Sequence, residues 1–233
     1  MVSSSPLMLW HGAETAVERP ASGPAAACKD FGPGFCCADS FEAACERIAY
    51  DDRNGVVSRY SLETSGLRII DLTKPPYSPL HWLSVLVRNR IFPPRGIFPQ
   101  RAAAYLPVLF PVAVDDADIV IGHFADDSRF AYAVRFLTNS ISLEQLSCAL
   151  KLAPAGRLIC IRTDRALERL TFLGSECVCR QGISEKVRRQ DLEFRRACSA
   201  SNAFDFSRPE LVGEIFIMDI LREEIDEHDP RLR

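Results

Sequence analysis

Residues 7–17, LMLWHGAETAV, begin as a short apolar run and stop at a His-Gly pair. The apolar run predicts a buried strand, and Gly12 gives the chain a hinge at its end. A histidine in that position can lie at the mouth of a cleft, where both ring nitrogens can hydrogen-bond a ligand. A histidine that only caps the strand is the alternative interpretation of His11.

Beyond this strand, helices and strands alternate without the regular βαβ period of a doubly wound sheet. Residues 18–35 are a long Pro-, Gly- and Ala-rich loop, and loops of this length in compact domains are often functional. Ser40 and Ser78 are N-cap residues of two amphipathic helices, the second with Pro79 at its first position. We expect further strands at 55–63, 67–73, 117–124, 156–163 and 171–180, and further helices at 128–137, 141–152 and 164–170.

This order of elements predicts an α+β fold. We expect one main domain over residues 7–180 and a C-terminal extension over 181–233, mostly helical and closed by an acidic tail. Residues 186–196, KVRRQDLEFRR, form a basic run on a helix, which is most often a solvated face and less often a contact with nucleic acid.

The composition is that of an ordinary soluble protein large enough to bury a core. The 233 residues are 47% hydrophobic and 25% charged, with a net charge of −3, so no global charge draws the chain to nucleic acid or to an anionic membrane. The apolar stretches are too short to span a membrane, and residues 1–10 lack the features of a signal peptide. We therefore expect a cytoplasmic protein.

The nine cysteines form no CxxC pair, and the four histidines are not at zinc-site spacing from any of them. We expect reduced thiols and no metal site. A reactive thiol at the Cys36-Cys37 pair is the less favoured alternative, because no adjacent Lys or His would lower its pKa.

Several blocks then occur in a fixed order, and together they carry a resemblance. They are LWHG (9–12), KDFGPGFCCADSFEAA (29–44), LRIIDL (67–72), HWLSVLVRNR (81–90), DIVIGHFADD (118–127) and LICIRTDRALERLTF (158–172). Over roughly residues 7 to 175 the chain resembles a bacterial domain-of-unknown-function family, DUF3990, in the ADP-ribosyltransferase-like clan. The resemblance implies a split fold in which two small mixed sheets grip NAD in a cleft.

The resemblance also implies roles for individual residues. His11 and Gly12 match the element that binds the adenosine ribose, whereas Gly34 and Phe35 match the loop beside nicotinamide. In addition, Cys36 and Arg47 lie at the cofactor-binding positions where relatives carry a stacking tyrosine and a tryptophan. Asp126 and Asp127 match acidic residues at a strand end, and with His11 they are the candidate catalytic residues.

Three positions depart from the pattern of an active transferase. Cys36 offers no ring face, and the charge of Arg47 would not favour the departing nicotinamide. Leu158 stands where active clan members have glutamate, and the neighbouring Arg157 would repel an oxocarbenium-like transition state. Phe35 and Tyr50 are possible replacement rings, although aromatic residues at these spacings are more often core.

Three functions follow from these observations. The first is a toxin-like protein of the ADP-ribosyltransferase type that uses NAD as a substrate to modify an unknown macromolecule, with a cognate neutralising protein as a further partner. The second is a catalytically degenerate module that binds NAD or ADP-ribose. The third is a purely structural partner of another chain, and for none of these do we expect membrane or nucleic-acid binding.

Overall fold

The computed structural model describes residues 6–21, 28–49, 55–92, 97–125, 127–152, 156–204 and 213–232. It confirms the α+β class. The chain forms two compact units, each built from three separate segments. Unit 1 comprises residues 1–71, 113–124 and 155–190, and unit 2 comprises 72–112, 125–154 and 191–233. The sequence-based boundary at residue 180 stays a prediction.

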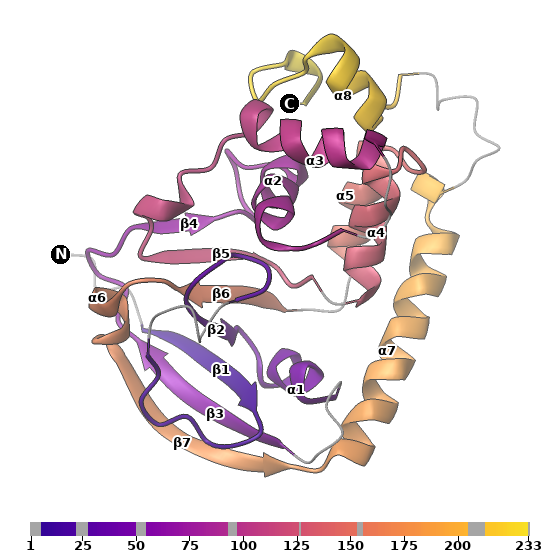
Figure 1. Ribbon diagram of the computed structural model, residues 1–233. Coiled ribbons are helices and arrows are strands. Elements are labelled where there is room, and N and C mark those ends of the chain that lie inside the picture. Colours follow the sequence, from indigo (N-terminus) through magenta and orange to yellow (C-terminus); the bar gives the residue numbers. More distant parts are fainter. Residues whose placement is uncertain are drawn as a thin grey trace. The chain divides into compact units, whose positions relative to one another are not determined.

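Unit 1 contains a mixed seven-stranded sheet in the order β4-β5-β6-β2-β1-β3-β7 (Figure 1). Only the β4–β5 pair is parallel. The strands are β1 (Leu7–Ala13), β2 (Phe35–Ala38), β3 (Gly55–Leu62), β4 (Ile69–Asp71), β5 (Ile119–His123), β6 (Arg157–Ile161) and β7 (Leu170–Val178).

The sheet is narrowest between β1 and β2. These strands share a single register pair, Trp10 with Ala38, whereas β1 pairs with β3 along its whole length. The resemblance implied two small sheets, and the structure instead joins all seven described strands in one. The narrow β1–β2 junction divides that sheet into a group containing β4, β5, β6 and β2 and a group containing β1, β3 and β7.

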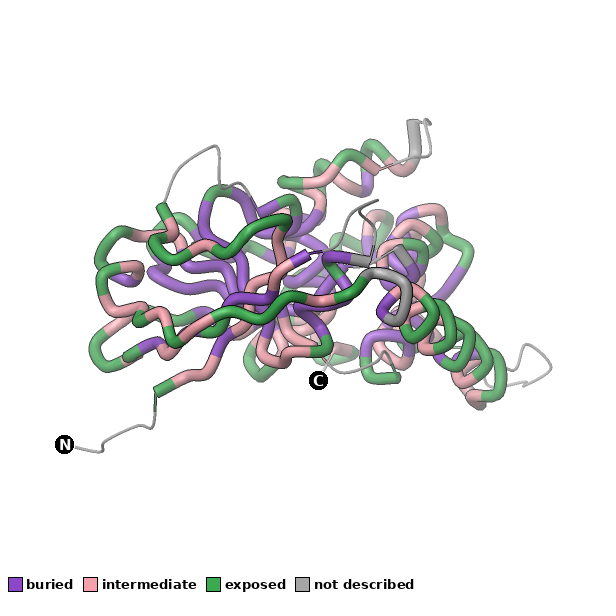
Figure 2. Tube along the Cα trace, turned by 90° about the horizontal axis from the view of Figure 1, so that it is seen from below, coloured by how far each residue is buried: buried purple, intermediate pink, exposed green. Residues whose placement is uncertain are grey.

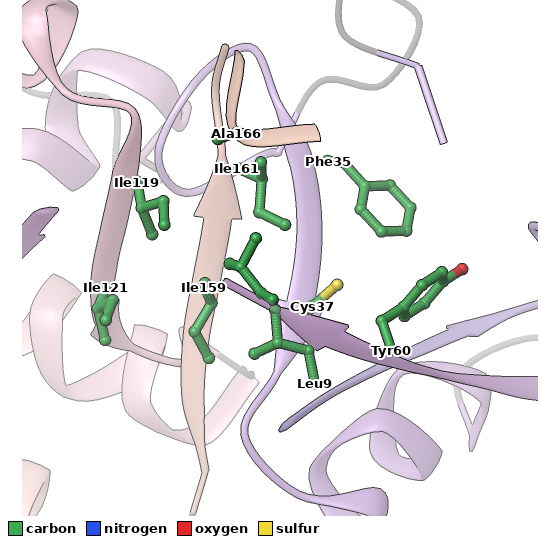
Figure 3. Close-up of a cluster of buried hydrophobic side chains, with 10 residues drawn as sticks. Leu9, Phe35, Cys37, Tyr60, Ile119, Ile121, Ile159, Ile161 and Ala166 are labelled. Carbon is green, nitrogen blue, oxygen red and sulfur yellow. The ribbon is translucent and has the colours of Figure 1, made fainter. Parts of the chain in front are cut away.

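Each face of the sheet carries its own apolar cluster, because successive strand side chains point to opposite faces. The first cluster gathers Leu9, Phe35, Cys37, Tyr60 and the isoleucines of β5 and β6, and it packs against Ala166 of α6 (Asp164–Leu167) (Figure 3). On the other face, α1 (Phe41–Ala49) packs with Ala38 and Val57. Figure 2 marks the buried residues in purple.

Unit 2 is helical in its described parts. It contains α2 (Pro79–Asn89), α3 (Ile97–Leu109), α4 (Asp127–Leu137), α5 (Leu143–Leu152) and α8 (Ile217–Glu223), whereas α7 (Arg180–Ala200) contributes residues to both units. Short 3-10 helices occur at Asn202–Phe204 and Pro230–Leu232 in this unit, and at Val114–Asp116 in unit 1.

Local signals predicted most of these elements. Ser78 caps α2, with its side chain accepting a hydrogen bond from the Leu80 amide, and Pro79 is the first helical residue. No local signal predicts α3, because a Pro-rich run precedes it and Pro107 lies inside it. Among the described residues, no helix is both long and apolar enough to cross a membrane.

Candidate functional site

His11 lies in β1, where the register pairs it with Ser58 of β3. Its Nδ1 is 2.6 Å from the carbonyl oxygen of Cys36 in β2. Because a carbonyl only accepts, Nδ1 carries the proton and donates, so a neutral ring has Nε2 as an acceptor. The side chain therefore bridges the two strands at the narrow junction and keeps one acceptor for a ligand.

The environment of His11 keeps the ring neutral. Burial lowers the pKa of His11 below its usual value; the hydrogen bond to Cys36 raises it, and the positive charge of Arg47 lowers it. Arg47 is an exposed residue in the last turn of α1. The charge of Arg47 therefore acts on His11 from α1, which packs on the sheet face opposite the His11 and Phe35 rings.

Phe35 lies against His11, with ring centroids 4.5 Å apart and planes tilted by 36°. Phe35 also meets Tyr60 edge to face, with ring centroids 5.6 Å apart (Figure 3). The hydroxyl of Tyr60 donates a hydrogen bond to the carbonyl of Val17. Phe35 is 5% exposed. It is thus both a core residue and the ring that holds the His11 imidazole in place.

Two glycines allow close approach around these strands. A side chain at Gly12 would collide with the backbone carbonyl of Ala44, so Gly12 lets α1 pack directly on β1. Gly34 has a φ of +149°, and a Cβ there would lie 2.6 Å from the sulfur of Cys160. The two glycines therefore shape the packing around β1 and β2.

Cys36 lies on the opposite face of β2 from Phe35. The Cys36 side chain is 4% exposed and forms a disulfide with Cys28. The expectation that all cysteines are reduced is therefore wrong for this pair, although the other seven are thiols. Backbone hydrogen bonds in both directions between Cys28 and Gly32 fold the loop back, which brings Cys28 to Cys36.

The position expected for a catalytic carboxylate is occupied by the fully buried Leu158. Its neighbour Arg157 forms ion pairs with Asp39, at 2.9 Å, and with Asp71, at 3.6 Å. Arg157 also lies opposite His123 in the β5–β6 register. Sequence reasoning missed this polar cluster, because its members come from the ends of four different strands.

Three of the predicted residues have no described side chain. Asp126 and Tyr50 lie outside the described residues, and Asp127 is the first residue of α4 without a described side chain. Of the predicted residues, the structure brings together the His11 ring, the Phe35 ring and the carbonyl of Cys36, whereas Gly12, the Cys36 sulfur and α1 with Arg47 lie on the opposite face of the sheet.

The face of β1 opposite His11 borders a cavity of about 420 Å³. Trp10 and Phe41 contribute its aromatic lining, and Arg59 and Glu176 contribute charge. Its volume is within the range of small-molecule sites. His11 is not among the lining residues, so the cavity and the His11 ring are separate features of unit 1.

A family model described as "Protein of unknown function (DUF3990)" matches residues 7–172. No curated protein and no solved structure matches the chain. The matched range includes every strand from β1 to β6 and the first residues of β7, and therefore all the described residues around His11.

Proposed function

This chain belongs to the DUF3990 family of proteins of unknown function, and we propose that it is an ADP-ribosyltransferase-like protein that binds NAD or ADP-ribose without catalysing transfer. The proposed site is the junction of β1 and β2 with the end of α1. The observation that carries the proposal is the fixed His11 ring, whose Nδ1 is bonded to Cys36 and whose Nε2 has no bond to a described residue.

A neutral histidine in this tautomer suits a ribose. Nε2 accepts a hydrogen bond from a ribose hydroxyl, and the bond to the Cys36 carbonyl fixes the direction of the acceptor before a ligand arrives. Preorganisation of this kind strengthens binding because less ordering is required when the ligand binds. The tilted contact with Phe35 restricts the ring further.

Arg47 supports the same ligand class. NAD and ADP-ribose both carry a diphosphate, and guanidinium groups bind phosphate oxygens through paired N–H donors. Arg47 is exposed and its charge acts on His11. We therefore assign the ribose to His11 and the diphosphate to Arg47.

The described residues at the expected catalytic positions do not support a transfer step. Leu158 is buried and uncharged where a carboxylate would stabilise the oxocarbenium-like centre, and Cys36 is in a disulfide on the face away from His11. Loss of one stabilising group in a transition state costs about 10²–10³ in rate. Binding without turnover is the function that these residues favour.

The test is calorimetric titration of the purified chain with NAD and with ADP-ribose, followed on the same sample by measurement of released nicotinamide. Binding of both ligands without release is the expected result. Binding with release would overturn the loss of catalysis and leave an active, toxin-like transferase. Absence of binding would overturn the assigned ligand.

His228→Ala is the matched control for His11→Ala. The side chain of His228 is 80% exposed and lies in the C-terminal acidic segment of unit 2. Replacing it removes the same chemical group without touching β1 or β2. Affinity should fall for His11→Ala and stay unchanged for His228→Ala.

A further inference from the structure

Three buried cysteines meet in unit 1. The sulfur atoms of Cys28, Cys36 and Cys160 all lie within 4.8 Å of one another, and each residue is at most 4% exposed. Cys36 and Cys160 are directly opposite in the β2–β6 register, and Cys28 comes from the loop before β2. The chain thus gathers three sulfur ligands from three segments.

The loop from Cys28 to Phe35 is shaped around these sulfurs. Its first turn is fixed by the two backbone hydrogen bonds between Cys28 and Gly32, of 2.9 and 3.0 Å. The Cys160 thiol lies 3.9 Å from the carbonyl oxygen of Pro33. A Cβ at Gly34 would collide with the same sulfur, so only glycine lets the loop close over Cys160.

The charges near Cys160 bear on its ionisation. Burial raises the pKa of the Cys160 thiol to about 12; Arg162 and Arg47 lower it, and Asp30 raises it. The two guanidinium groups would offset part of the negative charge of a three-thiolate centre.

We propose that Cys28, Cys36 and Cys160, when reduced, form a binding site for one thiophilic metal ion of the zinc class. Thiolates are soft ligands that select zinc-like ions over magnesium or calcium. Three cysteine ligands leave the fourth position of a tetrahedral site open. The Cys28–Cys36 disulfide is the oxidised, metal-free form of the same site. This inference does not rest on the proposed binding of NAD.

Conversion of the disulfide form into the metal-binding form requires a two-electron reductant, such as a phosphine. A phosphine transfers two electrons to the Cys28–Cys36 bond and becomes a phosphine oxide with an oxygen atom from water, which leaves two thiols. One divalent ion then forms three metal–sulfur bonds, and the three thiols release three protons to solvent. The oxidised protein has only the Cys160 thiol at this place and should not bind the ion.

The experiment uses the full chain with Cys177→Ser and Cys179→Ser, because these two exposed cysteines would chelate metal themselves. The protein is reduced with a phosphine, and the phosphine is then removed under anaerobic conditions. Cd²⁺ is added stepwise while the ultraviolet charge-transfer absorption of cadmium thiolate is recorded. We expect one Cd²⁺ per chain, and only a large excess of Zn²⁺ should compete for the site, because thiolates bind the softer Cd²⁺ more tightly. The oxidised protein should show no such absorption.

Cys160→Ser and Cys28→Ser should each weaken Cd²⁺ binding at least ten-fold. Cys45→Ala is the matched control, since Cys45 is a buried thiol of α1 that is not one of the three proposed ligands. This variant should bind Cd²⁺ as tightly as the parent does. Cys28 lies in a loop and Cys160 in a strand. If Cys160→Ser fails to fold, Cys28→Ser still tests the proposal. The proposal would be overturned if Cys28→Ser and Cys160→Ser both bind Cd²⁺ as the parent does, or if the reduced parent does not bind Cd²⁺.

Discussion

The imidazole of His11 donates from Nδ1 to the backbone carbonyl of Cys36, 2.6 Å away, across the junction where β1 and β2 share one register pair. The His11 side chain thus adds a hydrogen bond between two strands whose backbones pair over a single residue of each. The same contact fixes the ring tautomer on which the proposed ribose contact depends. His11 therefore has a structural role and a proposed binding role, and experiments must separate them.

Removal of the imidazole tests the binding role. His11→Ala should weaken NAD and ADP-ribose binding by about 1–3 kcal/mol, the usual cost of a lost hydrogen bond in a buried setting. Calorimetric titration measures the change. Circular dichroism of the variant separates lost binding from lost structure, and unchanged affinity in a folded variant would remove His11 from the site.

The pH dependence of stability tests the environment of His11. Its folded-state pKa is lowered by burial, whereas the unfolded chain titrates near 6.5. As the pH falls below about 6.5, the unfolded chain takes up a proton before the folded chain does. The free energy of unfolding should therefore fall until the pH reaches the lowered pKa of the folded state.

Urea denaturation at several pH values measures this effect, with His11→Gln as the comparison. The variant keeps a hydrogen-bonding side chain but does not titrate, so its stability should depend less on pH than that of the parent. Both proteins share the other three histidines, and only the difference between the two curves reports His11. Parallel curves would contradict the lowered pKa.

Local chemistry made much of the fold predictable. Ser40 accepts a hydrogen bond from the Ala43 amide, and Ser78 with Pro79 starts α2, as N-cap preferences predict. The missed helix α3 shows the limit of such signals, because its Pro107 argues against a helix when neighbouring packing is unknown. Ala102 and Leu106 of α3 are fully buried, which indicates that tertiary packing overrides the local preference.

The candidate site was less predictable, because its contacts are non-local. Twenty-five residues separate His11 from Cys36, and no periodicity reports which strands become neighbours. The cluster of Cys28, Cys36 and Cys160 was not predicted for the same reason, since the spacing of the cysteines along the sequence does not connect the first two to Cys160. The His-Gly pair was the one local signal that identified a residue of the site.

Asp118 organises one end of the sheet, and its replacement should be costly. Its carboxylate accepts hydrogen bonds from the Arg68 amide, at 2.8 Å, and from the Thr163 hydroxyl, at 2.7 Å, and these bonds lower its pKa. Asp118→Ala should reduce the free energy of unfolding by about 2–4 kcal/mol. Chemical denaturation at neutral pH measures the loss.

The matched control is Asp116→Ala, because the Asp116 side chain is 66% exposed and forms only a surface ion pair with Arg68 in the described residues. It should cost at most about 0.5 kcal/mol. The lowered pKa of Asp118 also means that its contribution is present above pH 4 and is lost as the pH falls through the folded-state value. Similar losses in both variants would contradict the assigned role.

Arg47 offers a test that separates the diphosphate from the ribose. Arg47→Gln should weaken ADP-ribose binding by about 1 kcal/mol, roughly five-fold, because an exposed charge pair contributes modestly. Adenosine, which lacks the diphosphate, should bind the variant and the parent equally. Titration calorimetry with the two ligands measures the contrast.

The same variant has a second readout that needs no ligand. The Arg47 charge lowers the pKa of His11, so its removal should raise that pKa in a proton NMR titration of the ring. Arg188→Gln, at an exposed position of α7, removes an equal charge and should change neither the His11 titration nor the affinity. A raised His11 pKa with unchanged ADP-ribose affinity would keep Arg47 near His11 but exclude it as the diphosphate ligand.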